Sequence, residues 1–141
     1  MSGAHYCIED LEVGMEAAHE RVVTGNDIET FAELSGDNNP VHLDADFAAK
    51  SPFKARIAHG MLTASFISTI LGTKLPGYGC IYLSQTLRFK APVRIGDTVR
   101  ASARIASLDR DKRRAALDCS VSVGDKVVLE GEALVLVPSR G

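Results

Sequence analysis

The stretch GMLTASFISTILGTKL, from Gly60 to Leu75, decides the fold. Within it, Met61 to Thr73 carries no charged side chain, and these 13 residues would form a helix about 20 Å long. A bilayer core needs about 20 apolar residues, so the run is too short to span a membrane. We therefore predict a helix over 60–75 that is buried in protein and wrapped by other elements.

The residues after this helix repeat with the two-residue period of strands that bury one face. The apolar members of the first run are Ile81, Leu83, Leu87 and Phe89. Gln85 is the only polar residue on that apolar face, and the alternation continues over 93–105 and 115–123. A hairpin turn at Gly124-Asp125 leads into a last apolar run, 126–137. The sequence predicts an α+β protein in which an antiparallel sheet surrounds one helix.

Shorter elements are predicted before the long helix. Asn26 and Glu29 have the spacing of a capping box, which predicts a helix from Asp27 to about Leu34. Residues 44–50 fit one further helical turn, and an edge strand is expected through Arg21 to Thr24.

Length and composition bound the class of protein. A chain of 141 residues forms one domain, 1–141, that buries about 68% of its unfolded surface. A net charge of −2 without a basic cluster argues against nucleic acid as a partner. The three cysteines have no metal-like spacing and no signal peptide is recognised, so a reducing, cytoplasmic location is expected.

The loop Ser35 to His42, SGDNNPVH, carries a carboxylate and an imidazole five residues apart. Pro40 keeps the residue before it out of helical geometry, so a defined turn sets Asp37 and His42. An ionised carboxylate and a neutral imidazole offer two acceptors for one water, which is general acid–base equipment. The alternative is local: Asp37 caps a helix or an Asx turn, and His42 is an ordinary half-buried histidine.

The segment RIAHGM, Arg56 to Met61, opens the long helix. The first N–H groups of a helix have no internal partners and lie at its positive dipole end. A glycine there lets a substrate oxygen approach the backbone, so the Gly60 N–H is a candidate oxyanion or carbonyl-polarising donor. The alternative is that Gly60 only relieves crowding between helix and sheet.

A metal site can be weighed against the four histidines. Asp37, His42 and His59 could supply three ligands. A backbone donor beside them serves a carbonyl substrate better than a cation, so no metal is predicted and His59 is interpreted as a structural residue. His5 and His19 are expected to be exposed.

These motifs, followed by a strand that starts with GDTV at Gly96, resemble the MaoC-like, (R)-specific enoyl-CoA hydratases of the hotdog fold. The resemblance runs from about Val13 to Val137, and 81–83 and 89–93 are similar to short bacterial members that supply hydroxyacyl-CoA for polyhydroxyalkanoate synthesis. It implies hydration of trans-2-enoyl-CoA to (R)-3-hydroxyacyl-CoA without a cofactor.

The resemblance also implies roles for individual residues. The family's catalytic aspartate and histidine correspond to Asp37 and His42, and its backbone donor corresponds to Gly60. Asn39 matches the asparagine before the proline, which would hold the loop or hydrogen-bond near the site, and Ser68 matches a polar position in the pocket.

Other interpretations and partners follow from the same resemblance. A hotdog acyl-CoA thioesterase is the nearest enzyme alternative, but many of these place a carboxylate on the central helix, and 60–75 has none. The other alternative is a non-catalytic acyl-CoA-binding module. A homodimer is expected, because a single hotdog leaves a sheet edge open. Arg88, Lys90 and Arg94 are candidates for binding CoA.

Overall fold

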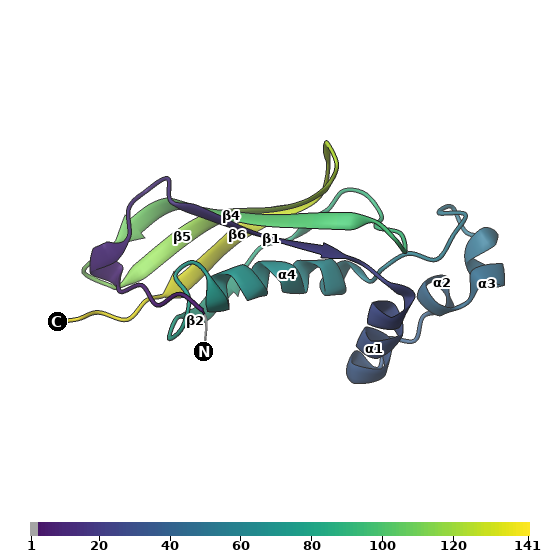
Figure 1. Cartoon of the computed structure of the whole chain (residues 1–141), viewed down its shortest axis with the longest axis horizontal. Helices are drawn as coiled ribbons and strands as arrows, with labels where there is room; N and C mark the ends of the chain where they lie inside the picture. The colour runs from purple at the N-terminus through teal and green to yellow at the C-terminus, as the bar shows by residue number, and fades with distance from the viewer. Residues whose placement is uncertain (1–2) are drawn as a thin grey trace.

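A computed structural model describes residues 3–141 (Figure 1). In this part of the chain, six strands form one antiparallel sheet in the order β1-β4-β5-β6-β2, and β3 also pairs with β6. The strands are β1 (Glu16–Val22), β2 (Ile81–Gln85), β3 (Arg88–Phe89), β4 (Thr98–Asp109), β5 (Arg114–Val123) and β6 (Lys126–Leu136). The helices are η1 (Ile8–Asp10), α1 (Gly25–Ser35), α2 (Pro40–Leu43), α3 (Ala45–Ala49) and α4 (Gly60–Thr73).

The helix α4 lies along one face of the sheet and packs against β1, β4 and β5 (Figure 1). Its residues Ile67, Ile70 and Leu71 are fully buried, and each such side chain stabilises the fold by about 1.5–3 kcal/mol. Buried and more exposed residues alternate along β4 as predicted, and Val99 and Ala101 lie in the core. The predicted hotdog arrangement, an uncharged helix wrapped by an antiparallel sheet, is therefore confirmed.

The prediction of one continuous strand over 81–89 with a buried apolar face is wrong. The segment is divided into β2 and β3, and in the gap the Thr86 carbonyl crosses so close to Gly131 that a Cβ there would lie 1.8 Å from the oxygen. Ile81, Leu83 and Phe89 are 55%, 43% and 52% exposed. The first two lie on an edge strand that no other element of the described chain covers.

The start of α1 also differs from the prediction. The capping box is formed by Thr24 and Asp27, not by Asn26 and Glu29: the Thr24 hydroxyl accepts from the Asp27 N–H at 3.1 Å, and the Asp27 carboxylate accepts from the Thr24 N–H at 3.0 Å. Asp27 also pairs with Arg21, which fixes the box to the end of β1.

The N-terminal strand begins earlier than the sequence pattern indicates. β1 runs from Glu16 because it pairs with β4 over its full length, from Glu16 opposite Arg104 to Val22 opposite Thr98. His19 is half-buried beside the Phe66 ring, so its predicted exposure is wrong, whereas His5 is exposed as expected.

The helices α1, α2 and α3 lie at one end of the sheet, beyond the N-terminus of α4 (Figure 1). The loop 36–39 between α1 and α2 is thereby carried to the first turn of α4. Among residues 3–141, no helix has the length and apolar character needed to cross a membrane.

Candidate active site

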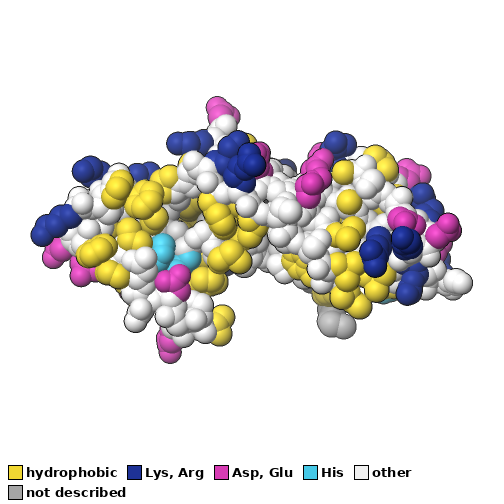
Figure 2. Space-filling model, turned by 180° about the vertical axis from the view of Figure 1, so that it is seen from behind, with side chains coloured by type: hydrophobic (Ala, Val, Ile, Leu, Met, Phe, Trp, Pro, Cys, Tyr) yellow, Lys and Arg dark blue, Asp and Glu magenta, His cyan; other side chains and the backbone are white. Residues whose placement is uncertain are grey.

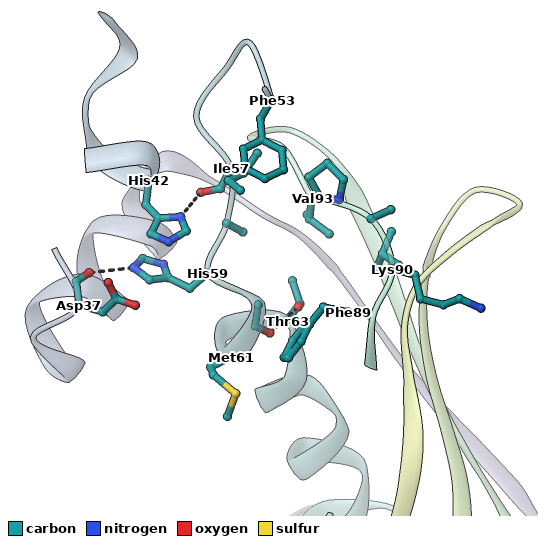
Figure 3. Close-up of a pocket in the computed structure, with 15 residues that line it drawn as sticks. Asp37, His42, Phe53, Ile57, His59, Met61, Thr63, Phe89, Lys90 and Val93 are labelled. Atoms are coloured by element: carbon teal, nitrogen blue, oxygen red, sulfur yellow. Dashed lines mark hydrogen bonds between the residues drawn. The ribbon is translucent and has the colours of Figure 1, made fainter. Parts of the chain in front are cut away.

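A cavity of about 480 Å³ lies at the first turn of α4 and contains the predicted acid–base pair (Figure 3). Its lining comes from the α1–α2 loop, the residues that lead into α4, and the segment 89–93 on β3 and after it. Figure 2 shows histidine and acidic side chains together at this end of the molecule, with hydrophobic side chains around them. An apolar hollow with a few converging polar groups is the usual form of a small-molecule site.

Local turn chemistry builds the loop that carries Asp37. Gly36 ends α1 in the left-handed region at φ 82°, a conformation that favours glycine. Asn39 caps α2, because its side-chain oxygen accepts from the Val41 N–H at 3.2 Å, and Pro40 is the first residue of that helix. Asn39 therefore supports the loop and does not line the cavity.

The structure is compatible with both interpretations of Asp37, as a local turn residue and as an acid–base group. The Asp37 Oδ1 accepts from the Asn39 N–H at 3.3 Å, which is the local Asx-turn contact. The side chain is nevertheless exposed and lines the cavity, so the carboxylate is accessible to a bound water.

His42 is held from two sides by the segment before α4. Its ring is buried, and Nδ1 lies 2.8 Å from the Ile57 carbonyl oxygen. Because a carbonyl only accepts, Nδ1 carries the hydrogen and the neutral ring keeps its lone pair on Nε2. The Arg56 Nε donates to the His42 carbonyl at 2.7 Å, which fixes the backbone of the same residue.

Gly60 is the first residue of α4 and lines the cavity. A Cβ at this position would lie 2.6 Å from the Phe89 ring, so the close packing expected of a structural glycine is present. The same position leaves the first N–H of the helix free of an intrahelical partner, as a carbonyl-polarising donor requires. Both interpretations of Gly60 are compatible with the structure.

His59 completes a cluster in which Asp37, His42 and His59 present ligand atoms within 4.8 Å of one another. The two imidazole rings are stacked, with centroids 3.9 Å apart and planes at 26°. A metal ion about 2.0–2.1 Å from each nitrogen must lie near both ring planes, and stacked planes do not meet at that distance. The arrangement suits a hydrogen-bonded water better than a shared metal.

The remaining predicted residues divide between this cavity and other surfaces. Lys90 lines the cavity and pairs with Glu130 at 3.2 Å. Arg94 reaches the rim, where its Nη2 donates to the Phe53 carbonyl at 3.0 Å. Arg88 instead lines a second hollow, because neighbouring residues on β3 face opposite sides and Phe89 faces the cavity.

Ser68 is exposed and does not line the cavity of the single chain, so its position in the acyl pocket stays a prediction. It belongs to an exposed stripe of α4 with Met61 and Ser65, because residues three and four apart share a helix face. Ser68 therefore lies on the face of α4 that the described chain leaves exposed.

The structure also identifies cavity residues that the sequence analysis missed, chiefly Phe89 and Thr63. A thiol or phenol nucleophile is not among them. Burial raises the pKa of Cys119 to about 11 and that of Tyr82 to about 12, so both are protonated at neutral pH. Both residues also lie outside the cavity lining.

A family model and the most similar curated relatives indicate the same protein family. The MaoC like domain matches residues 10–128. A 3-hydroxybutyryl-CoA dehydratase of Methylorubrum extorquens is 54% identical over 94% of this chain and 84% of the relative. An (R)-specific enoyl-CoA hydratase of Rhodospirillum rubrum is 50% identical over 97% of this chain and 94% of the relative.

A solved structure agrees with these relatives. The (R)-hydratase from A. caviae involved in PHA biosynthesis superposes with a TM-score of 0.90 at 44% identity, covering 92% of this chain and 99% of that one. With its hotdog fold and this domain match, the chain belongs to the MaoC-like dehydratase family.

Proposed function

We propose that this protein is an (R)-specific enoyl-CoA hydratase, which adds water reversibly to trans-2-enoyl-CoA and gives (R)-3-hydroxyacyl-CoA. The observation that carries the proposal is the pairing of an accessible Asp37 carboxylate with a His42 ring whose Nε2 lone pair is free, beside the start of α4. The names of the relatives from M. extorquens and R. rubrum describe the two directions of such a reaction.

The chemistry assigns one task to each group. Asp37 and His42 each accept a hydrogen bond from one water. As the water oxygen adds to the β-carbon of the enoyl thioester, one of the two groups takes one proton, and the other hydrogen stays on the new hydroxyl. The electrons of the double bond move toward the thioester oxygen, where the Gly60 N–H stabilises the negative charge. The proton released from the water reaches the α-carbon through the same pair, so water is added with no proton left over.

The direct test is the loss of the ultraviolet absorbance of the enoyl thioester when the protein meets crotonyl-CoA. Fast loss without release of free CoA supports a hydratase. Release of free CoA, detected with a thiol reagent, would indicate a thioesterase, and tight binding without either change would indicate an acyl-CoA-binding module.

Replacing Gly60 with alanine is expected to lower kcat/KM for crotonyl-CoA about 10- to 100-fold. The added Cβ would lie 2.6 Å from the Phe89 ring, so either the ring or the first turn of α4 must move, and with it the N–H donor. Losing one oxyanion donor outright costs about 10²–10³ in kcat. Steady-state kinetics on both proteins measure the effect.

Gly72→Ala is the matched control for this change. It lies in the same helix, and a Cβ there meets no heavy atom within 4 Å. It should keep wild-type kinetics and stabilise the fold by about 0.5–1 kcal/mol. Equal activity of Gly60→Ala and wild type would remove the helix-start donor from the mechanism.

A homodimer is proposed to complete the assembly, with the β2 edges of two sheets side by side. β2 exposes the apolar side chains of Ile81, Tyr82 and Leu83, whereas the opposite edge, β1, is rich in charged residues that discourage pairing. The exposed stripe of α4 that contains Ser68 would then face the partner copy.

Leu83→Glu is expected to convert this dimer into a monomer, because it introduces a charge into the apolar edge of β2. Light scattering should give about 30 kDa for wild type, twice the chain mass of 15.1 kDa, and half that value for the variant. Val13→Glu, at a site 61% exposed just before β1, should leave the mass unchanged. If Leu83→Glu kept the mass of a dimer, the β2 edge would be ruled out as the interface.

The cellular setting is proposed from less specific features. The three cysteines, Cys7, Cys80 and Cys119, are all unpaired, which suits a reducing cytoplasm. Supply of (R)-3-hydroxyacyl-CoA for fatty-acid or polyhydroxyalkanoate metabolism is proposed by similarity to the A. caviae (R)-hydratase, which is involved in PHA biosynthesis. Lys90 and Arg94, at the cavity and its rim, are the proposed contacts for the CoA phosphates.

A further inference from the structure

We infer that His59 is a positioning residue that holds Asp37 and His42 in working geometry through the proton on its Nε2 atom. The inference builds on the proposed hydratase activity and assigns a role to a residue outside the acid–base pair. Figure 3 shows the His59 ring between Asp37 and His42, at the N-terminal end of α4.

The first contact ties the catalytic loop to the long helix. His59 Nε2 lies 2.9 Å from the Asp37 carbonyl oxygen, and the ring is only 2% exposed. The other hydrogen bonds of Asp37 are local: its N–H donates to the Ser35 hydroxyl, and its carboxylate accepts from Asn39. His59 therefore provides the long-range hydrogen bond that locates this exposed residue relative to Gly60.

The same contact determines the proton on His59. A carbonyl oxygen can only accept, so Nε2 donates and the neutral ring keeps its lone pair on Nδ1. That Nδ1 atom is buried and has no hydrogen-bond partner among the described residues. The protein thus keeps a histidine with one nitrogen satisfied and the other unsatisfied beside its catalytic pair.

Aromatic contacts fix the plane of the ring. His59 is stacked on His42 with centroids 3.9 Å apart, and Phe31 of α1 lies 4.8 Å away on a tilted plane. These contacts fix the plane of the ring, and the Nε2 hydrogen bond to the Asp37 carbonyl fixes which edge of the ring faces the loop. His59 consequently touches both members of the proposed pair.

A role in stability alone explains these features less well. His59 occupies the N-cap position of α4 but makes no side-chain capping bond. Its donor is directed instead at the Asp37 carbonyl, in the loop that carries the proposed catalytic carboxylate.

Two amide variants separate the donor from the ring. Glutamine can place its amide nitrogen near the position of Nε2 and donate to the Asp37 carbonyl, whereas asparagine is one methylene too short. We expect His59→Gln to keep kcat for crotonyl-CoA within about threefold of wild type and His59→Asn to lose about 10- to 100-fold, with KM nearly constant. Displacement of a catalytic group by about 1 Å has an effect of that size.

His59→Phe adds a variant that keeps an aromatic stack and removes the donor. It should lose kcat like His59→Asn, and its melting temperature distinguishes loss of the donor from loss of the fold. The matched control is His19→Phe, at a half-buried histidine 6.0 Å from Phe66 and outside the cavity lining. The control should retain wild-type kinetics.

The outcomes are decisive in both directions. Equal kcat for His59→Gln and His59→Asn would overturn the inference, even if His59→Phe failed to fold. Imidazole ¹⁵N shifts that put the hydrogen on Nδ1 would also overturn it. A wild-type protein without hydratase activity would refute the proposed function, whereas an active wild type with active His59→Asn would refute only the role of His59.

Discussion

Asp37→Asn is expected to lower kcat for hydration of crotonyl-CoA about a thousandfold, within the range of 10²–10⁴ typical of general acid–base groups. The amide keeps the shape of the side chain, and its oxygen can still accept from the Asn39 N–H, as Oδ1 of Asp37 does at 3.3 Å. It loses the negative charge that accepts a proton from water. A thousandfold loss corresponds to about 4 kcal/mol of transition-state stabilisation.

The measurement compares turnover with binding. Affinity for a non-reactive acyl-CoA should change less than about threefold, because the proposed role of Asp37 is to bind the water and not the acyl chain. Asp111→Asn, at an exposed position in the turn before β5, is the matched loss of charge and should leave turnover unchanged. Near-normal turnover by Asp37→Asn would contradict the mechanism.

Local chemistry explains why the Asp37 loop could be predicted from the sequence. Gly36, Asn39 and Pro40 each impose a conformation through contacts within a few residues, so their geometry is specified before the chain folds. The packing of α4 against the sheet was predictable for a similar reason, because an apolar run without charge over 61–73 favours burial in protein.

Contacts between distant segments were not predictable in this way. The packing of Phe89 against Gly60 and the bond from His59 to Asp37 each join segments that only the folded sheet brings together. A two-residue period indicates which side chains share a face, but not which element covers that face. For this reason the period at 81–89 suggested burial, whereas Ile81 lies exposed on an edge strand.

The positions of Arg88 and Ser68 follow the same limit. Arg88 was grouped with Lys90 by its charge, but Arg88 lies on β3 and lines the second hollow with Glu130 and Glu132, whereas Lys90 follows the end of β3 and lines the cavity. Ser68 lies on the face of α4 that the single chain leaves open. In the proposed dimer this face of α4 would meet the partner copy, where Ser68 could line the acyl pocket.

The second large effect is expected at His42. His42→Asn should lower kcat about a thousandfold while the fold is retained, because the asparagine amide nitrogen can replace Nδ1 as the donor to the Ile57 carbonyl, now 2.8 Å away. The substitution removes Nε2, the proposed acid–base nitrogen, together with the rest of the ring that stacks on His59. Stopped-flow absorbance with crotonyl-CoA measures the loss, and circular dichroism checks the fold.

The double variant Asp37→Asn/His42→Asn then tests whether the two groups act on one water. Residues that act as a unit lose most of their effect with the first substitution, so the double variant should be less than about tenfold slower than either single variant. Independent groups would instead multiply their losses to about a millionfold. If the losses multiplied, Asp37 and His42 would serve separate steps, and the single shared water would have to be replaced by two distinct proton transfers.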